Sequence, residues 1–234
     1  MAKNIAKGGR DNYPTPQIYA DWAIERALML MPSTPEYVLG LEPGCGATAP
    51  FLSALVDQAP EVGRGVGVES EVWVPKLSAV TGENLKIRMG TDFLDSKQDH
   101  LWMPEPDTKF FLIATNPPFS VCEEFMDKSL SLLHPMGVMV FLLRMAIMGS
   151  KKRRDFWRKH MPLEIAHFIR RISFNGTSTD YAEYACFFWA GEELEDLWHR
   201  HRGLCSTAFY LVDNVTDSIN EKGCLEEIGA PPFV

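Results

Sequence analysis

Residues 37–49, YVLGLEPGCGATA, lead from a short apolar run through a glycine-containing turn into a helical pattern. The run over 37–42 predicts a buried strand, and Thr48 is placed to open a helix that carries Phe51, Leu52, Leu55 and Val56 on one face. Gly44 and Gly46 let the backbone bend tightly and approach a ligand closely. This order of strand, turn and helix is typical of α/β folds that bind a nucleotide or nucleoside at the carboxyl end of a strand.

The rest of the chain continues the alternation of strand-like and helical segments. Helical patterns cover 16–30 and 122–133, and further strands are expected at 64–69, 84–90, 109–115 and 137–143. Two more apolar runs, 164–170 and 181–190, are joined by a loop too short for a parallel return, which favours an antiparallel hairpin. The pattern predicts a Rossmann-like α/β fold with a mostly parallel sheet that ends in this hairpin. Residues 1–190 would form the domain, with 191–234 as a partly irregular C-terminal extension of it.

Composition limits the class of protein. The chain has 234 residues, of which 46% are hydrophobic and 23% charged, so one globular domain is expected. The longest apolar run, 136–148, is interrupted by Arg144 and is too short to span a bilayer. The five cysteines and the pair His199 and His201 lack metal-ligand or disulfide spacing, so no metal site is expected. We expect a cytoplasmic monomer or homodimer that makes no contact with a membrane.

Charge is distributed unevenly along the chain. The formal net charge is −8, which disfavours a nucleic-acid partner, but residues 144–171 hold nine Lys or Arg against two acidic residues, a net +7. A run of this kind is as often a solvated helix face as a phosphate-binding surface.

Three acidic residues, Glu42, Glu69 and Asp92, each follow a predicted strand. Because the carboxyl ends of parallel strands share one edge of the sheet, we expect these carboxylates in one crevice. Glu69 could accept the hydroxyl groups of a ribose. Asp92 could accept the exocyclic amine of an adenine, with Phe93 packing on the ring, although a turn-capping role for Asp92 is equally open.

The glycine turn by itself leaves two kinds of ligand open. Gly44, Gly46 and Ala49 satisfy the dinucleotide fingerprint G-x-G-x-x-A. However, Glu42 and Pro43 stand directly before the turn, and an anionic carboxylate there would repel a pyrophosphate and attract a cationic ligand. S-adenosylmethionine carries an ammonium and a sulfonium group and no phosphate, so it is the expected cofactor.

Residues 114–120, ATNPPFS, end the strand expected at 109–115 with a stiff polar and aromatic corner. Pro117 and Pro118 fix their own φ and restrict the residues before them, so the Asn116 side chain and the Pro117 carbonyl are held in place. Two such acceptors can bind the hydrogens of an exocyclic amine and draw its nitrogen toward tetrahedral geometry for attack on a methyl group. Phe119 would stack on the target base, which must leave its helix to reach the site. A stiff loop with a buried Phe anchor is the simpler alternative.

These features together resemble the class I S-adenosylmethionine-dependent methyltransferases, specifically the short bacterial and bacteriophage enzymes that methylate adenine N6 in DNA. Asn116, Pro117, Pro118 and Phe119 match the catalytic motif of that family. The resemblance implies S-adenosylmethionine as cofactor, and it implies a cofactor site formed by Tyr13, Thr15, Pro16, Glu42, Pro43, Gly44, Gly46, Glu69, Asp92, Phe93 and Asn116.

The chain departs from the family in two places. The segment between the proline and the last glycine of the turn is one residue shorter than usual. A target-recognition domain usually has on the order of a hundred residues, whereas about twenty join the third and fourth expected strands and 44 follow the expected hairpin. Recognition of the target sequence would then fall to residues 149–160 and to the loop 171–180, or specificity would be short or loose. Contact with DNA phosphates would fall to the basic segment within 144–171, in particular to Lys151, Lys152, Arg153, Arg154, Arg158 and Lys159.

Other functions remain open. RNA methylation at adenine N6 or guanine N2 is the nearest alternative, because related RNA enzymes also use Asn-Pro-Pro followed by an aromatic residue. A protein-glutamine methyltransferase usually has tyrosine in the fourth place. A nucleotide-dependent oxidoreductase leaves the Asn116 motif without a role, and a cofactor-sensing binding protein has no need of Asn116.

Overall fold

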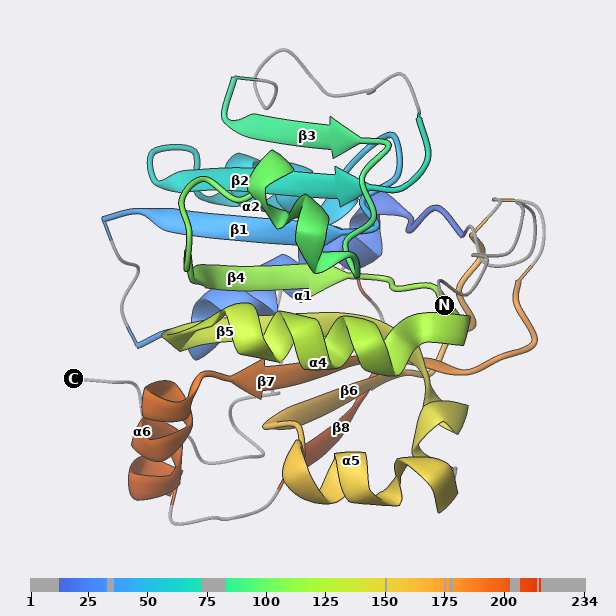
Figure 1. The fold of residues 1–234 in the computed structure, drawn as a ribbon. Coiled ribbons are helices and arrows are strands. Elements are labelled where there is room, and N and C mark those ends of the chain that lie inside the picture. Colours follow the sequence, from blue (N-terminus) through green and yellow to red (C-terminus); the bar gives the residue numbers. More distant parts are fainter. Residues whose placement is uncertain are drawn as a thin grey trace.

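The computed structural model describes residues 13–32, 36–72, 83–149, 151–174, 176, 179–202, 207–213 and 215, with the backbone alone at 201 and 202. Within these residues one sheet has the strand order β3-β2-β1-β4-β5-β7-β6-β8 (Figure 1). The strands are β1 (Val38–Pro43), β2 (Gly63–Glu69), β3 (Leu85–Met89), β4 (Phe110–Thr115), β5 (Leu133–Arg144), β6 (Glu164–Phe168), β7 (Tyr184–Ala190) and β8 (Ala208–Val212). The α-helices are α1 (Gln17–Leu30), α2 (Pro50–Gln58), α4 (Cys122–Leu132), α5 (Arg154–Lys159) and α6 (Glu192–Arg202). Short 3-10 turns are η1 (Ser96–Leu101), η2 (Phe119–Val121), η3 (Met145–Gly149) and η4 (Lys151–Arg153).

The pairing of the strands confirms the predicted fold class. Strands β3, β2, β1, β4 and β5 pair in parallel, and β7 pairs antiparallel with both β5 and β6. The expected hairpin is therefore present, with β7 rather than β6 next to β5. Each parallel strand ends at the same edge of the sheet, so the loops that follow β1 to β5 meet there.

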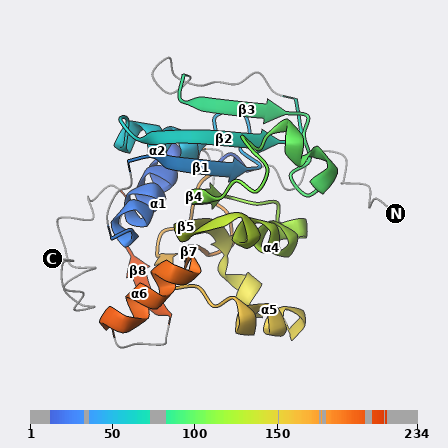
Figure 2. The same cartoon turned by 60° about the vertical axis from the view of Figure 1, so that its left-hand side comes forward.

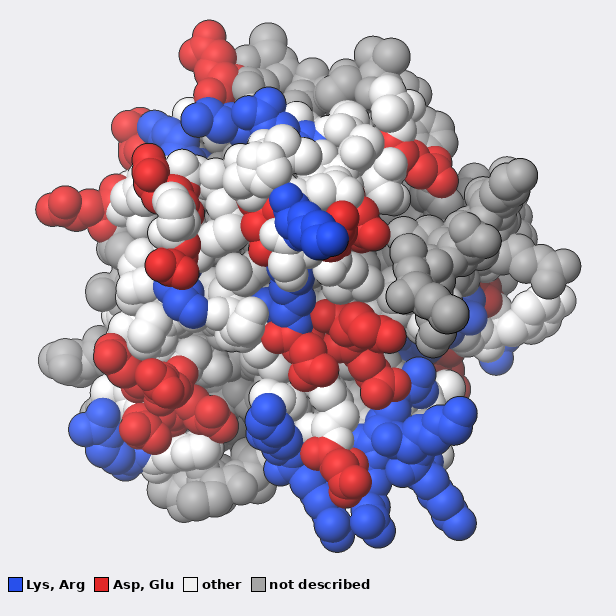
Figure 3. Space-filling model, in the orientation of Figure 1, with Lys and Arg blue, Asp and Glu red and all other residues white. Residues whose placement is uncertain are grey.

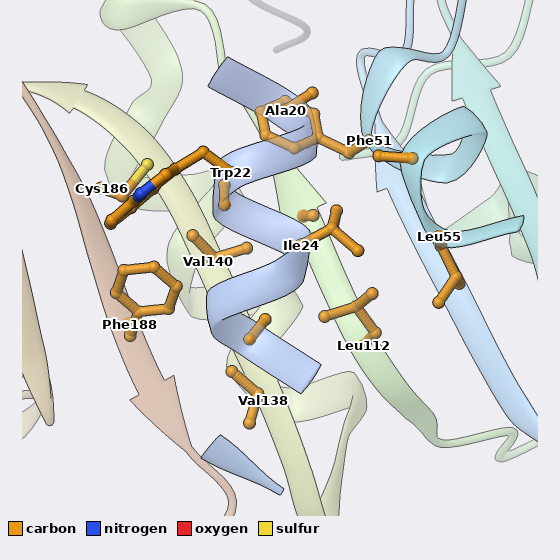
Figure 4. Packing of buried hydrophobic residues seen from close by; sticks show 14 of the residues in the cluster. Ala20, Trp22, Ile24, Phe51, Leu55, Leu112, Val138, Val140, Cys186 and Phe188 are labelled. Carbon is orange, nitrogen blue, oxygen red and sulfur yellow. The ribbon is translucent and has the colours of Figure 1, made fainter. Parts of the chain in front are cut away.

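Both faces of the sheet are buried, because alternate side chains along the central strands point to opposite helical layers. Val138, Val140 and Leu142 of β5 belong to the cluster that contains α1 and α2, whereas Met139, Phe141 and Leu143 belong to the one that contains α4. Figure 4 shows Trp22 and Ile24 of α1 against the strand side chains, and Figure 2 shows the helices on the two sides of the sheet. This packing makes the sheet a rigid base for its edge loops.

One local prediction was wrong, and two further elements were not predicted. Helix α2 begins at Pro50 rather than at Thr48, because Ala49 takes a left-handed conformation (φ 42°) and serves as the N-cap without a side-chain hydrogen bond. Within the C-terminal extension, two elements that were not expected are present among the described residues, α6 and β8. In α6 the acidic residues hide a buried pair, Leu194 and Trp198, whose spacing of four places both on one helical face.

A buried ion pair joins α1 to the far part of the sheet. The Nε and Nη2 nitrogens of Arg26 lie 2.8–3.0 Å from the carboxylate oxygens of Glu164 in β6, and both side chains are at most 2% exposed. The Tyr210 hydroxyl of β8 donates to the same carboxylate at 3.3 Å. The pair thus fixes α1 against two strands that follow it in the chain by more than 130 residues.

Removing one member of this pair should destabilise the protein strongly. Arg26→Met leaves the Glu164 carboxylate buried without its cation, and we expect the free energy of unfolding to fall by about 3–5 kcal/mol. Urea denaturation followed by circular dichroism measures the change. Arg154→Met, at a largely exposed arginine, is the control and should change it by less than about 0.5 kcal/mol. Equal effects of the two substitutions would contradict the assignment.

Candidate active site

The glycine turn after β1 lies against the loop that follows β4. Gly44 and Gly46 have φ of 70° and 59°, a region that side chains other than glycine rarely adopt. The Gly44 amide donates to the Val68 carbonyl of β2 at 2.7 Å, and a Cβ at Gly44 would lie 4.0 Å from Pro118. The turn is therefore hydrogen-bonded to the end of β2, and Pro118 of the Asn116–Phe119 loop is one of its neighbours.

Glu42, the fifth residue of β1, is buried and serves as an acceptor for helix α2. Its Oε2 accepts the backbone amide of Leu52 at 2.9 Å, which supplies the cap that Ala49 cannot provide. Burial raises the pKa of the Glu42 carboxyl well above its ordinary value; the amides of Leu52 and Phe51 act in the opposite sense, and the nearby charge of Glu69 raises it further. A cation next to this carboxyl would favour its ionised form.

Glu69, at the end of β2, closes the glycine turn from the other side. Its Oε2 accepts the Gly46 amide at 2.9 Å, and its Oε1 accepts the Glu71 amide at 2.9 Å and the Ser70 hydroxyl at 3.2 Å. A carboxylate oxygen has two lone pairs, so this arrangement orients the Glu69 carboxylate without exhausting its acceptor capacity.

Asp92 and Phe93 follow β3, and their side chains have different surroundings: the Asp92 carboxylate is in a turn and the Phe93 ring is in the core. The Thr91 amide donates to the Glu69 carbonyl at 2.9 Å, which brings this segment beside the end of β2. Asp92 Oδ1 accepts the Leu94 amide at 2.9 Å, so the carboxylate caps its own turn. Phe93 is only 2% exposed and packs on Trp102 and Phe125, with its ring in the core.

The Asn116–Phe119 loop is fixed at both ends. Thr115, fully buried at the end of β4, donates its hydroxyl to the Pro43 carbonyl at 2.5 Å, which ties β4 to β1. The Asn116 side-chain nitrogen donates to the Tyr13 carbonyl at 3.2 Å, so the segment before α1 lies beside the loop. Thr15 and Pro16 follow Tyr13, and Pro16 is the N-cap of α1.

An aromatic cluster surrounds Phe119. Tyr13 lies 6.0 Å from Phe119 between ring centroids, Tyr184 of β7 lies 6.3 Å away, and Phe174 contacts both Tyr13 and Tyr184 at 5.4 and 5.0 Å. The Arg144 guanidinium, at the end of β5, lies over the Phe119 ring with 3.9 Å from its carbon to the ring centroid. Figure 1 shows the connection from β6 to β7 at the same edge of the sheet as the ends of β1 to β4.

The comparisons with known proteins support the fold. No protein-family model and no curated protein sequence matches the chain. A Listeria monocytogenes protein described as a class I S-adenosylmethionine-dependent methyltransferase matches with a TM-score of 0.69 at 16% identity, over 97% of this chain and 74% of that one. The methyltransferase subunit of a type I restriction-modification system from Streptococcus thermophilus matches with a TM-score of 0.60 at 16% identity, over 76% of this chain and 45% of that one. An rRNA methyltransferase from Streptomyces viridochromogenes matches with a TM-score of 0.52 at 11% identity, over 82% of this chain and 91% of that one.

The chain has the fold of the class I S-adenosylmethionine-dependent methyltransferases. It spans less than half the length of the restriction-modification subunit. Among the described residues, no helix is long and apolar enough to cross a bilayer, and no three His, Cys, Asp or Glu side chains gather as a metal site needs.

The basic segment forms a surface beside α4. Lys151, Lys152, Arg154, Arg158 and Lys159 are exposed, whereas Arg153 is partly buried and forms an ion pair with Glu123 of α4 at 2.6 Å. Figure 3 shows these basic side chains together at the lower right, next to acidic side chains over α4. Trp157 is 7% exposed and stacks on Phe187 and Trp189, so it anchors α5 to the sheet.

Sequence reasoning missed the side chains around Phe119. In the sequence Arg144 belongs only to the basic run, yet in the structure it bonds the Tyr184 hydroxyl and the Asp180 carboxylate, each at 3.0 Å. The available signal was a single arginine at the end of a strongly apolar strand, on the edge where ligands bind. Asp180 and Tyr184 gave no signal of their own, because Arg144 is distant from both in the sequence.

Because the pKa of Glu42 is raised, we expect the free energy of unfolding of the ligand-free protein to depend on pH. The folded state holds the proton of this carboxyl more tightly than the unfolded state, whose pKa is about 4.3, so stability falls as the pH rises from there toward the folded pKa. Glu42→Gln removes this contribution while its amide oxygen can still accept the Leu52 amide. The variant should therefore gain stability relative to the parent as the pH rises, by up to about 1.4 kcal/mol per unit.

Urea denaturation at several pH values between about 5 and 8 measures the difference. Glu105→Gln, in an exposed loop, is the control and should keep a constant offset from the parent protein. Parallel curves for Glu42→Gln and the parent would show that the Glu42 carboxyl titrates normally.

Proposed function

We propose that the protein transfers a methyl group from S-adenosylmethionine to the N6 amine of an adenine that has left its DNA helix. The observation that carries this proposal is the hydrogen bond from Thr115 to the Pro43 carbonyl, which joins the residue directly before the Asn116–Phe119 loop to the residue directly before the glycine turn. A cofactor at the turn would stand next to groups able to hold an amine. This adjacency is what methyl transfer requires.

The turn fits S-adenosylmethionine better than a ligand with phosphates. Residues 38–58, which contain the turn and the start of α2, include no Lys or Arg, and the carboxylates of Glu42 and Glu69 lie on its two sides. From residues 38–58 a pyrophosphate would meet no cation, and it would lie between two acids, whereas a ligand with a positive charge would stabilise the ionised form of Glu42. Glu69 would accept the ribose hydroxyls, and Tyr13, Thr15 and Pro16 would lie along the cofactor.

The loop after β4 supplies the acceptors for the amine. When bound, the cofactor supplies an electrophilic methyl group and leaves as a neutral thioether. The Asn116 side-chain oxygen and the Pro117 carbonyl would accept the two hydrogens of the amine and direct its lone pair toward the turn. The side-chain nitrogen of Asn116 already donates to Tyr13, which leaves the oxygen oriented the other way. After transfer the amine nitrogen loses one proton to solvent.

The substrate class follows from the motif and the basic surface together. Asn-Pro-Pro-Phe suits a planar exocyclic amine that stacks on Phe119, and the exposed Lys and Arg of η4 and α5 suit a phosphate backbone. The restriction-modification subunit that matches the fold favours DNA, and the matching rRNA methyltransferase keeps RNA methylation at adenine N6 or guanine N2 as the alternative. A methylation assay that supplies both nucleic acids separates the two.

Asn116→Ala should separate binding from chemistry. Labelled S-adenosylmethionine is supplied with duplex DNA, single-stranded DNA, RNA or protein, and the modified nucleoside is identified by mass after digestion. We expect label in DNA adenine with the parent protein, and a roughly 10²–10³-fold loss of turnover in the variant, by analogy with removal of one transition-state hydrogen-bonding group. Cofactor affinity, measured by calorimetry, should change little.

Asn84→Ala is the matched control and should keep full turnover. Asn84 lies directly before β3, at the edge of the sheet where the parallel strands begin and not at the edge where they end. Label in guanine, RNA or glutamine would overturn the substrate assignment. Retention of most activity by Asn116→Ala would overturn the role of the loop.

The basic surface should determine the salt dependence of DNA binding. Lys152→Gln combined with Arg158→Gln removes two exposed charges, and the slope of log affinity against log salt should become shallower by about 0.9 for each phosphate that is no longer neutralised. Binding to duplex DNA is measured by fluorescence anisotropy at several salt concentrations. Lys86→Gln combined with Arg200→Gln removes the same charge from other exposed positions. Identical slopes for the two double variants would show that the surface over α5 does not bind DNA.

A further inference from the structure

Three aromatic rings form a cage around the guanidinium of Arg144. Its central carbon lies 3.9 Å from the centroid of Phe119, 5.7 Å from that of Tyr13 and 5.8 Å from that of Tyr184. The rings come from the segment before α1, the loop after β4 and strand β7. A guanidinium is flat and carries delocalised charge, so it can stack on an aromatic face in the way a nucleobase does.

Arg144 is held in this cage by polar partners on its rim. Its Nε donates to the Tyr184 hydroxyl and its Nη2 to Asp180 Oδ2, each at 3.0 Å, and the same Asp180 oxygen accepts the Tyr184 hydroxyl at 2.6 Å. The Asp180 amide is in turn bonded to the Ile172 carbonyl at 3.0 Å. The guanidinium thus fills the cage with both stacking and hydrogen-bonding contacts.

The side chain can leave the cage without disturbing the sheet. The backbone of Arg144 is paired with Tyr184 at the last position of β5, so the strand stays in register whatever the rotamer of the side chain. The Arg144 side chain is 32% exposed, which places one side of it in solvent. Its long, flexible stem gives it several rotamers outside the cage.

With Arg144 in place, the Phe119 face it covers is closed to any other ring. A separation of 3.9 Å is already that of two stacked groups, so no base can insert between them. The cage is also beside Asn116. The Tyr13 backbone carbonyl accepts a hydrogen bond from the Asn116 side-chain nitrogen, and the Tyr13 ring is part of the cage. A base ring in the cage would therefore bring its exocyclic amine to the acceptors of the loop.

We propose that the cage of Tyr13, Phe119 and Tyr184 is the binding site for the ring of the target base, and that Arg144 occupies it until the base displaces the guanidinium. This inference rests on the proposed function, since it assigns the target site of that reaction. Arg144 acts as a resident competitor that only a well-placed base can replace. The apparent affinity for the base is then reduced by the fraction of molecules in which the cage is open.

Removal of the competitor should strengthen binding of a free base analogue. The probe is 2-aminopurine deoxyriboside, a fluorescent isomer of deoxyadenosine, titrated with protein in the presence of S-adenosylhomocysteine. If the cage is open in about a tenth of the molecules, Arg144→Ala should bind the probe roughly tenfold more tightly than the parent. Phe119→Ala in the Arg144→Ala background should abolish the gain, because this variant no longer has the stacking surface.

Asp180→Asn is a second route to the same result. It keeps the guanidinium but weakens its anchor, and it should also tighten probe binding, by less than Arg144→Ala. Arg200→Ala, on the exposed side of α6, is the control and should bind the probe as the parent does. Equal or weaker binding by Arg144→Ala and Asp180→Asn would overturn the inference, as would the absence of probe binding to preparations that methylate DNA adenine.

The two hypotheses fail separately. The mass-based methylation assay tests the reaction with the parent protein alone, and it does not depend on the position of Arg144. If DNA adenine is methylated but Arg144→Ala shows no gain for the probe, the function stands and the cage is wrong. If the label appears elsewhere, the function fails whatever the probe shows.

Discussion

The buried carboxylate of Glu42 is the constraint on which the site depends. Helix α2 begins after a left-handed Ala49 that has no side chain able to cap it, so its first amides need an acceptor from outside the helix. Glu42 provides one from the preceding strand. Because the acceptor lies in β1 and the donor in α2, the turn between them has a fixed shape, and both glycines must take the positive φ that closes it.

The same turn fixes its neighbours. The Gly46 amide orients the Glu69 carboxylate, and the Gly44 amide is bonded to the Val68 carbonyl of β2. These two hydrogen bonds fix the end of β2 relative to the turn that follows β1. Thr115 then ties the end of β4 to Pro43. The four groups that a methyl transfer would use, two carboxylates, a glycine turn and an amide-proline loop, are thus linked by hydrogen bonds before any ligand binds. Preorganisation of this kind reduces the cost of binding and of reaching the transition state.

Much of this arrangement was predictable because it depends on local sequence. Strand β2 was expected at 64–69 and is Gly63–Glu69, and the position of Glu69 after it follows directly. Strand β5 starts at Leu133, four residues before its predicted start, because His134, Pro135 and Gly137 look like a turn but lie within the strand. Helix α6 was not predicted, since only Leu194 and Trp198 mark its buried face, among acidic residues that carry no periodic signal.

The cage around Arg144 was not predictable, for a different physical reason. Its members, Tyr13, Phe119, Arg144, Asp180 and Tyr184, come from five places in the chain, and each has an ordinary explanation in its own local context. They meet because α1 is packed into the core and holds the Tyr13 segment across the ends of β4 and β5, while β7 inserts next to β5 and brings Tyr184 opposite Arg144. The insertion of β7, which periodicity cannot show, is therefore what turns an isolated arginine at a strand end into the centre of an aromatic cluster. A charged residue that ends a buried strand at the ligand-binding edge is best interpreted together with the strand that pairs beside it.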